Sequence, residues 1–195
     1  LGGQPNPPST AYFMLVTNTL KSQLAAIGFS ADKITYLALS HSHGDHVGNA
    51  NDYAASTWLA QKTEHDAMFG QNVRPESINP NYRLLKNSKT GILQGDHDVF
   101  GDGTVVLKYT PGHTPGHQSL YVKLARTGGI VLSGDLYHYP EERTLGRMPE
   151  REKTTGTPAS RAGLEAFMKE VHAELWIEHD INAYSKIKKS PEYYD

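Results

Sequence analysis

The sequence feature that most limits how this chain can fold is the segment HSHGDH at residues 41–46, which directly follows the apolar run KITYLALS at residues 33–40. The run is short and carries β-branched and aromatic residues, which predicts a buried strand. Three histidines and an aspartate therefore crowd one strand end: His41, His43, Asp45 and His46. Ligand sites gather at such ends, because loops converge there while the sheet holds them still.

The rest of the chain alternates helical and strand patterns. Helices are expected at residues 20–27, 61–69 and 161–172. Strands are expected in a hairpin DVFGDGTVVLKYT that turns at Asp102-Gly103, in SLYVKLA, in GIVLS and in ELWIEHD. Mixed elements of this kind predict an α/β fold with helices outside a sheet. A length of 195 residues without internal repeats predicts one domain over residues 1–195.

Further metal-binding residue types lie at other expected strand ends. His113 lies in TPGHTPGH, Asp135 follows GIVLS, and His179 follows ELWI. With the first cluster, these residues make five histidines and two aspartates, enough for two neighbouring metal sites. Imidazoles and carboxylates suit zinc, and also iron or manganese.

The HSHGDH loop is itself able to serve two ions. Alternate residues His41 and His43 can point to one side, while Gly44 lets the backbone turn so that Asp45 and His46 face a second ion. One short loop can thus contribute to both sites.

Other histidines and glycines have simpler interpretations. We expect His65, His97 and His172 to be surface or hydrogen-bonded residues. His117, in the second Pro-Gly-His unit, is a candidate hydrogen-bond partner behind the ligands. The glycines before His113 and His117 are expected to bend the loop.

Composition excludes several partners. The formal net charge is -2 with no long basic run, so a nucleic-acid partner is not expected. No apolar run approaches eighteen residues, so no membrane partner is expected either. Cysteine is absent, which removes thiolate ligands and thiol nucleophiles. The start LGGQPNPPST lacks a leader pattern, so a cytoplasmic location stays open, as does a periplasmic or secreted one after leader removal.

These motifs together resemble the metallo-β-lactamase superfamily. The resemblance rests on HSHGDH, the His of TPGH, the Asp of SGD and the late His179, and it covers the chain from about Leu20 onward. It implies an αββα sandwich with a two-metal site on one edge. Carried over, the first metal would be bound by His41, His43 and His113, the second by Asp45, His46 and His179, and both by Asp135.

Within the superfamily, the chain looks most like the N-acyl homoserine lactonase branch. TPGHTPGHQSL carries this likeness, as do the 22 residues from His113 to Asp135 and the 44 from Asp135 to His179. Two departures stand out. The N-terminal strands expected before the first motif look truncated or interrupted. Lactonases of this type carry a tyrosine three residues after the bridging aspartate, where this chain has His138, with Tyr137 one place earlier.

The resemblance implies a two-zinc hydrolase that opens lactones or cleaves esters of small molecules. Two cations about 3.5–4 Å apart would acidify a shared water, which then attacks the carbonyl. Asp45 would pass a proton to the departing alkoxide, and Tyr137 or His138, with His138 favoured, would stabilise the oxyanion.

Alternatives remain open at this level. A two-metal site attacks phosphorus equally well, so a phosphotriester hydrolase is the main rival, and a β-lactamase-like side activity is a lesser one. The non-enzyme alternative is a truncated protein that binds metal without activity. An open sheet edge would also permit a homodimer.

Overall fold

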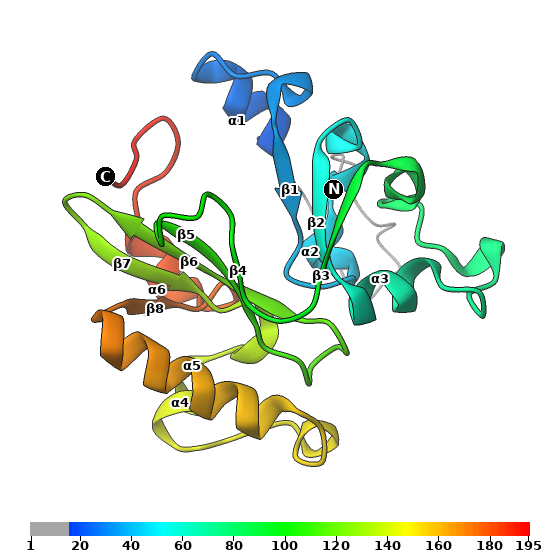
Figure 1. Ribbon diagram of the computed structural model, residues 1–195. Coiled ribbons are helices and arrows are strands. Elements are labelled where there is room, and N and C mark those ends of the chain that lie inside the picture. The colour runs from blue at the N-terminus through cyan, green and yellow to red at the C-terminus, as the bar shows by residue number, and fades with distance from the viewer. Residues whose placement is uncertain (1–15) are drawn as a thin grey trace, which may run out of the picture.

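The computed structural model describes residues 16–195, which form two β-sheets packed against each other (Figure 1). The first sheet is parallel in the order β1-β2-β3, with bounds Tyr36–Ala38, Thr57–Gln61 and Thr90–Leu93. The second sheet has the order β4-β5-β6-β7-β8, with bounds His97–Asp98, Val105–Tyr109, Gln118–Leu124, Gly128–Leu132 and Glu174–Trp176. Its strands are antiparallel except that β8 runs parallel to β7.

Helices cover the outer faces of both sheets. Their bounds are Leu20–Ala26 for α1, Gly44–Val47 for α2, Lys62–Phe69 for α3, Pro140–Thr144 for α4, Thr157–Val171 for α5 and Ile181–Lys186 for α6. Helix α5 lies along the outer face of the five-stranded sheet, and α3 lies beside the three-stranded sheet (Figure 1). The layers are therefore helix, sheet, sheet and helix, and the predicted αββα sandwich is confirmed.

The side chains of β2 alternate between two apolar cores, one on each face of its sheet. Trp58 and Ala60 face the helices and pack with Met68 of α3. Leu59 points the opposite way and packs with Leu107 of the other sheet. Successive residues of a strand point to opposite faces, so one strand supplies both the helix-sheet core and the sheet-sheet core.

The predicted strand at residues 33–40 exists but is shorter and less buried than expected. Residues Ala31–Lys33 form a 3-10 helix, and only Tyr36–Ala38 pair with β2. Tyr36 and Ala38 are exposed, because β1 is the edge of its sheet in the described part of the chain. The prediction of a buried strand was wrong, since an apolar run does not distinguish an edge strand from a central one.

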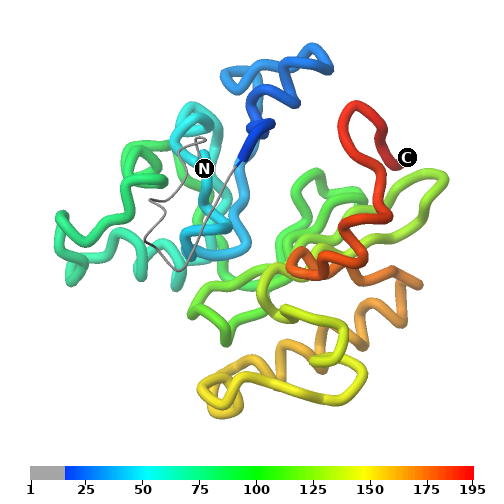
Figure 2. The backbone as a smooth tube through the Cα atoms, turned by 180° about the vertical axis from the view of Figure 1, so that it is seen from behind, coloured from blue at the N-terminus to red at the C-terminus, as the bar shows by residue number. Residues whose placement is uncertain are grey.

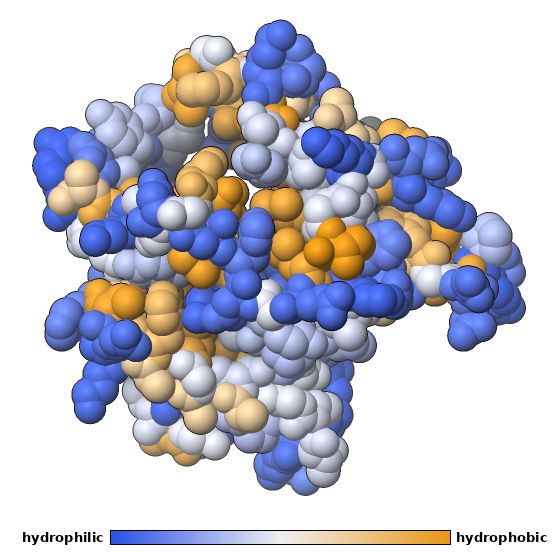
Figure 3. All heavy atoms as spheres, in the orientation of Figure 1, coloured by the Kyte–Doolittle hydropathy of each residue, from blue (hydrophilic) through white to orange (hydrophobic). Residues whose placement is uncertain are grey.

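Apolar side chains also reach the surface between the two sheets. Figure 3 shows them in the middle of the face that Figure 1 presents. Tyr36 and Phe100 are both exposed, and their rings meet edge to face with centroids 6.3 Å apart.

The predicted shortage of strands before the first motif falls mostly on residues 1–15, outside the described part.

Helix α5 begins four residues before the predicted position. Pro158 lies in its first turn, where a missing N–H costs no hydrogen bond. The helix ends at His172, whose left-handed conformation with φ of 54° closes the last turn. The early start matters, because the first turns of α5 contact the loops that carry the predicted site.

The C-terminal segment that ends at Asp195 lies beside the turn between β6 and β7 (Figures 1 and 2). The backbone N–H groups of Arg126 and Thr127 donate to the carbonyl of Asp195, at 2.9 and 2.6 Å.

The hairpin of β4 and β5 has the predicted turn, in which the Asp98 carboxylate accepts the N–H groups of Gly101 and Gly103. Among the described residues no helix has the length and apolar character needed to cross a membrane.

Candidate metal centre

The seven predicted ligands meet at one edge of the sandwich, in two neighbouring groups. The first group is His41, His43, His113 and Asp135, and the second is Asp45, His46 and His179. Within each group, the ligand atoms lie within 4.8 Å of one another. They come from the segments that follow β1, β5, β7 and β8, as the strand-end argument predicted, with Asp45 and His46 in the short helix α2.

Asp135 lies between the groups and presents one carboxylate oxygen to each. Its Oδ2 is 3.1 Å from His113 Nε2 and 3.5 Å from His41 Nε2. Its Oδ1 is 3.0 Å from His46 Nε2 and 3.1 Å from His179 Nε2, yet it is buried without a hydrogen bond among the described residues. Imidazole nitrogens and carboxylate oxygens that converge in this way are the ligand types of a transition-metal site, so these residues fit two metal ions.

Glu64 of α3 ties together the two loops that carry most of the first group. Its Oε1 accepts the N–H of Ser42 at 2.8 Å, inside the HSHGDH segment. Its Oε2 accepts the Thr114 hydroxyl at 2.8 Å and the Gly116 N–H at 2.9 Å. A Cβ on Gly116 would lie 2.3 Å from the Glu64 nitrogen, so this close approach requires glycine.

His117 supports the backbone of the bridging residue, as the predicted hydrogen-bond partner behind the ligands. Burial lowers the pKa of His117 to about 3, so the ring is neutral. Its Nε2 accepts the N–H of Asp135 at 2.9 Å, which leaves Nδ1–H to donate to the Thr110 hydroxyl at 2.9 Å. Gly134 approaches the same ring with φ of +54°, and a Cβ there would lie 2.5 Å from Nε2.

The pKa shifts of Asp135 and His41 favour metal binding, whereas the Asp135 carboxylate raises the pKa of His46 against the effect of burial. Burial disfavours a charged Asp135, but its interactions with the imidazoles of His113, His138 and His46 outweigh burial and hold the pKa of this carboxyl below the usual range. Burial lowers the pKa of the His41 imidazole, and the neighbouring imidazoles lower it further. A neutral imidazole and an ionised carboxylate are the forms that bind metals.

Of the two residues proposed to stabilise an oxyanion, only His138 lies at the site. Its Nε2 is 3.5 Å from Asp135 Oδ2. Tyr137 is 3% exposed and points into the core, where its hydroxyl donates to Glu165 at 3.1 Å and its ring lies under Arg161. Burial raises the pKa of Tyr137 to about 12. The expectation that Tyr137 acts at the metals is therefore corrected, because alternation along the extended segment sends it away from them.

Four glutamates support the site and were not predicted: the buried Glu64, Glu142 and Glu152, and the exposed Glu178. Glu142 accepts from the His138 backbone N–H at 3.0 Å and from Arg161 at 2.7 Å. Glu178 accepts from the hydroxyl of Ser133 at 2.9 Å, just before the bridging aspartate. These glutamates carry no sequence signal, because a single acidic residue in a polar segment looks like an ordinary solvated charge.

A pocket of about 310 Å³ beside the centre contains Asp45 and His46 and is otherwise mostly apolar. Its apolar side chains include Leu20, Leu37, Leu39 and Val47.

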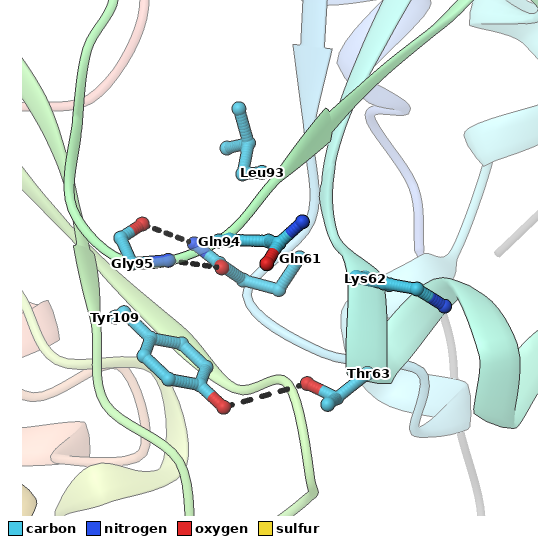
Figure 4. Close-up of a pocket in the computed structure, with 7 residues that line it drawn as sticks. All are labelled: Gln61, Lys62, Thr63, Leu93, Gln94, Gly95 and Tyr109. Carbon is cyan, nitrogen blue, oxygen red and sulfur yellow. Dashed lines mark hydrogen bonds between the residues drawn. The ribbon is translucent and has the colours of Figure 1, made fainter.

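Another pocket, of about 370 Å³, contains none of the clustered residues (Figure 4). There Gln61 bonds both backbone groups of Gly95, and the Tyr109 hydroxyl points toward Thr63. The Thr63 hydroxyl also donates to the carbonyl of Pro115, so this pocket lies behind the loop that presents His113.

Known proteins resemble this chain in sequence and in fold. The N-acyl homoserine lactonase AttM of Agrobacterium fabrum is 31% identical over 183 residues, a match that covers 88% of this chain and 68% of the relative. The N-acyl homoserine lactonase AiiA of Bacillus thuringiensis subsp. kurstaki is 29% identical over 174 residues, covering 87% and 65%. A solved N-acyl homoserine lactone hydrolase with N-hexanoyl-L-homoserine bound at its catalytic metal centre superimposes with a TM-score of 0.74 at 26% identity, covering 94% of this chain and 70% of that one.

The family model described as the metallo-beta-lactamase superfamily matches residues 7–171, a range that includes six of the seven clustered residues. With the four-layer sandwich and the paired ligand groups at its edge, this match shows that the chain belongs to the metallo-beta-lactamase superfamily.

Proposed function

We propose that this protein is a metal-dependent hydrolase that opens lactones, with N-acyl homoserine lactones as its substrate class. The observation that carries the proposal is the bridging carboxylate of Asp135, which serves two groups of ligands beside an apolar pocket. The relatives named above are lactonases of this class, which supports the same reaction here.

The residues present suit two zinc ions, and iron or manganese would be accepted by the same donors. His41, His43 and His113 would hold one ion, and Asp45, His46 and His179 the other, with Asp135 shared. When bound, the metals supply Lewis acidity and a water acidic enough to be a nucleophile near neutral pH.

Asp45 is placed to handle the proton of the leaving group. Its Oδ2 lies 3.6 Å from the Nε2 atoms of both His46 and His179, and its side chain is 47% exposed. An ionised carboxylate at the mouth of the site can accept a proton from the attacking water and release it to the departing alkoxide. Ring opening needs this transfer, because the alkoxide is a poor leaving group without it.

His138 is placed to donate a hydrogen bond to the carbonyl oxygen as negative charge develops on it. Its Nδ1 faces Glu142, at 3.3 Å from Oε1, and its Nε2 faces the centre. The Asp135 carboxylate raises the pKa of His138, although burial opposes this. Carboxylates on both sides of the ring favour its protonated form, which can donate a hydrogen bond from the nitrogen that faces the centre.

The apolar pocket beside Asp45 and His46 suits the acyl chain of the substrate. Each buried methylene contributes about 0.8 kcal/mol, which corresponds to about a fourfold change in affinity. We therefore expect kcat/KM to rise by up to about fourfold per added methylene until the pocket is filled.

The experiment is a substrate profile on N-acyl homoserine lactones of increasing chain length, an aryl phosphotriester and a β-lactam. Leu20→Lys places a charge in the pocket and is expected to remove the chain-length preference while the short-chain rate persists. Ile27→Lys is the matched control, because Ile27 is an exposed apolar residue at the end of the same helix and outside the pocket. Faster turnover of the phosphotriester than of every lactone would contradict the proposal.

A further inference from the structure

His113 is held from behind by a buried carboxylate. Its Nδ1 lies 2.9 Å from Glu152 Oε1, while its Nε2 lies 3.1 Å from Asp135 Oδ2. The side chains of His113 and Glu152 are 2% and 1% exposed. Glu152 belongs to the segment between β7 and α5, 39 residues after His113 in sequence.

Glu152 is itself fixed by the start of α5. Its Oε2 accepts the hydroxyl of Thr157, which is fully buried, at 3.2 Å. The first turn of α5 also packs closely against the loop that carries His113. A Cβ on Gly112 of this loop would lie 2.2 Å from the Thr157 nitrogen, and the Ser160 hydroxyl donates to the Pro111 carbonyl at 2.7 Å. The carboxylate therefore has little freedom to leave His113.

The hydrogen-bond partner of His113 Nδ1 determines which tautomer the ring adopts, and so whether Nε2 has a lone pair that can bind metal. A carboxylate accepts but does not donate, so it keeps the proton on Nδ1 and leaves the lone pair of Nε2 directed at the centre. His41 and His46 lack this constraint at Nδ1, because both face the hydroxyl of Ser40, at 3.1 and 3.2 Å. A hydroxyl can donate or accept, so it selects neither tautomer.

We propose that Glu152 is a positioning residue for metal binding, which acts through His113 by fixing its tautomer and its ring orientation. The inference rests on the proposed metal centre. Partners of this kind, when removed, typically cost about 10- to 100-fold in metal affinity. Glu152 would thus set the affinity of the first group of ligands without touching metal or substrate.

The test compares zinc affinity, by competition with a chromophoric chelator, in the parent and in Glu152→Gln. The glutamine amide can donate as well as accept, so it no longer selects the tautomer, and affinity is expected to fall about 10- to 100-fold. Glu152→Asp keeps the carboxylate and is expected to recover part of the loss. Glu150→Gln is the matched control with parental affinity, because Glu150 is 87% exposed two residues away and pairs with Lys153.

Two further measurements separate positioning from general destabilisation. Cobalt substituted into the site is expected to give an altered visible absorption spectrum in Glu152→Gln, since the orientation of one ligand changes. Glu142→Gln removes a second buried carboxylate from the same segment, one that contacts His138 instead of a ligand, and it is expected to keep zinc affinity.

Three outcomes would overturn the inference. Parental zinc affinity and spectrum in Glu152→Gln would show that the hydrogen bond is not needed. Equal losses in Glu142→Gln and Glu152→Gln, with lowered thermal stability of both metal-free proteins, would assign the effect to folding. A parent protein that binds neither zinc nor cobalt would overturn the proposed function itself, and this inference with it.

Discussion

Replacing His138 by alanine is expected to slow lactone turnover while leaving the metal content unchanged. His138 Nε2 is 3.5 Å from Asp135 Oδ2, at the centre but outside both groups of ligands. Loss of one donor to a developing oxyanion typically lowers kcat by about 100- to 1000-fold, or about 2.7–4 kcal/mol. His138→Gln, which keeps an N–H donor, is expected to recover part of this loss.

Tyr137→Phe is the neighbouring control. It removes only the hydroxyl that donates to Glu165 at 3.1 Å, and Glu165 keeps its bidentate pair with Arg143. Loss of one such hydrogen bond costs about 0.5–1.5 kcal/mol. For a domain of this size that cost lowers Tm by about 1–6 °C. Turnover at saturating substrate is expected to stay parental.

The assay measures kcat and KM for a medium-chain N-acyl homoserine lactone, with metal content by elemental analysis and Tm for each variant. Near-parental kcat in His138→Ala would show that carbonyl polarisation does not need this side chain. Loss of metal together with activity would instead make His138 a ligand, which would also refute the reasoning. A large fall in kcat for Tyr137→Phe would contradict its placement in the core.

Three further changes test other parts of the structure. Asp135→Asn removes the charge shared by both groups and is expected to lose at least one metal ion per chain, by elemental analysis, and more than about 100-fold in kcat. Gly112→Ala places a Cβ 2.2 Å from the Thr157 nitrogen at a φ of +144°, and is expected to cost at least about 1–3 kcal/mol in urea unfolding. The Arg143 guanidinium lowers the pKa of Glu165, so this pair stabilises the fold above the unfolded pKa of about 4.3 and the benefit is lost at lower pH. Since the pair is partly exposed, Glu165→Gln is expected to lower stability by no more than about 1 kcal/mol at pH 7, and by less at pH 3.

The placement of the ligands was predictable, because each follows a strand and the strand pattern is local. His113, Asp135 and His179 lie at three strand ends that the sequence identifies by apolar runs and turn residues. The choice between His138 and Tyr137 was predictable only in part. Alternation requires that one face the site, but which one depends on the path of the chain after Asp135.

The supporting carboxylates were not predictable in the same way. Glu152 and His113 are separated by 39 residues, and Arg161 and Glu142 by 19. Such pairs form only because α5 packs on the second sheet, which brings its first turns next to the His113 loop and the segment after β7. The exposure of β1 was missed for a related reason, because it depends on which strand lies next to it and not on its own residues.

The long sequence separations within the centre also determine the order in which its two groups of residues can assemble during translation. His43 and His113 meet across 70 residues, and His46 and His179 meet across 133. A chain emerging from the ribosome, amino end first, can assemble the first group before the last strand exists, whereas the second group must wait for β8. The second group can therefore form only after residue 179 has left the ribosome, whereas His41, His43, His113 and Asp135 can meet earlier.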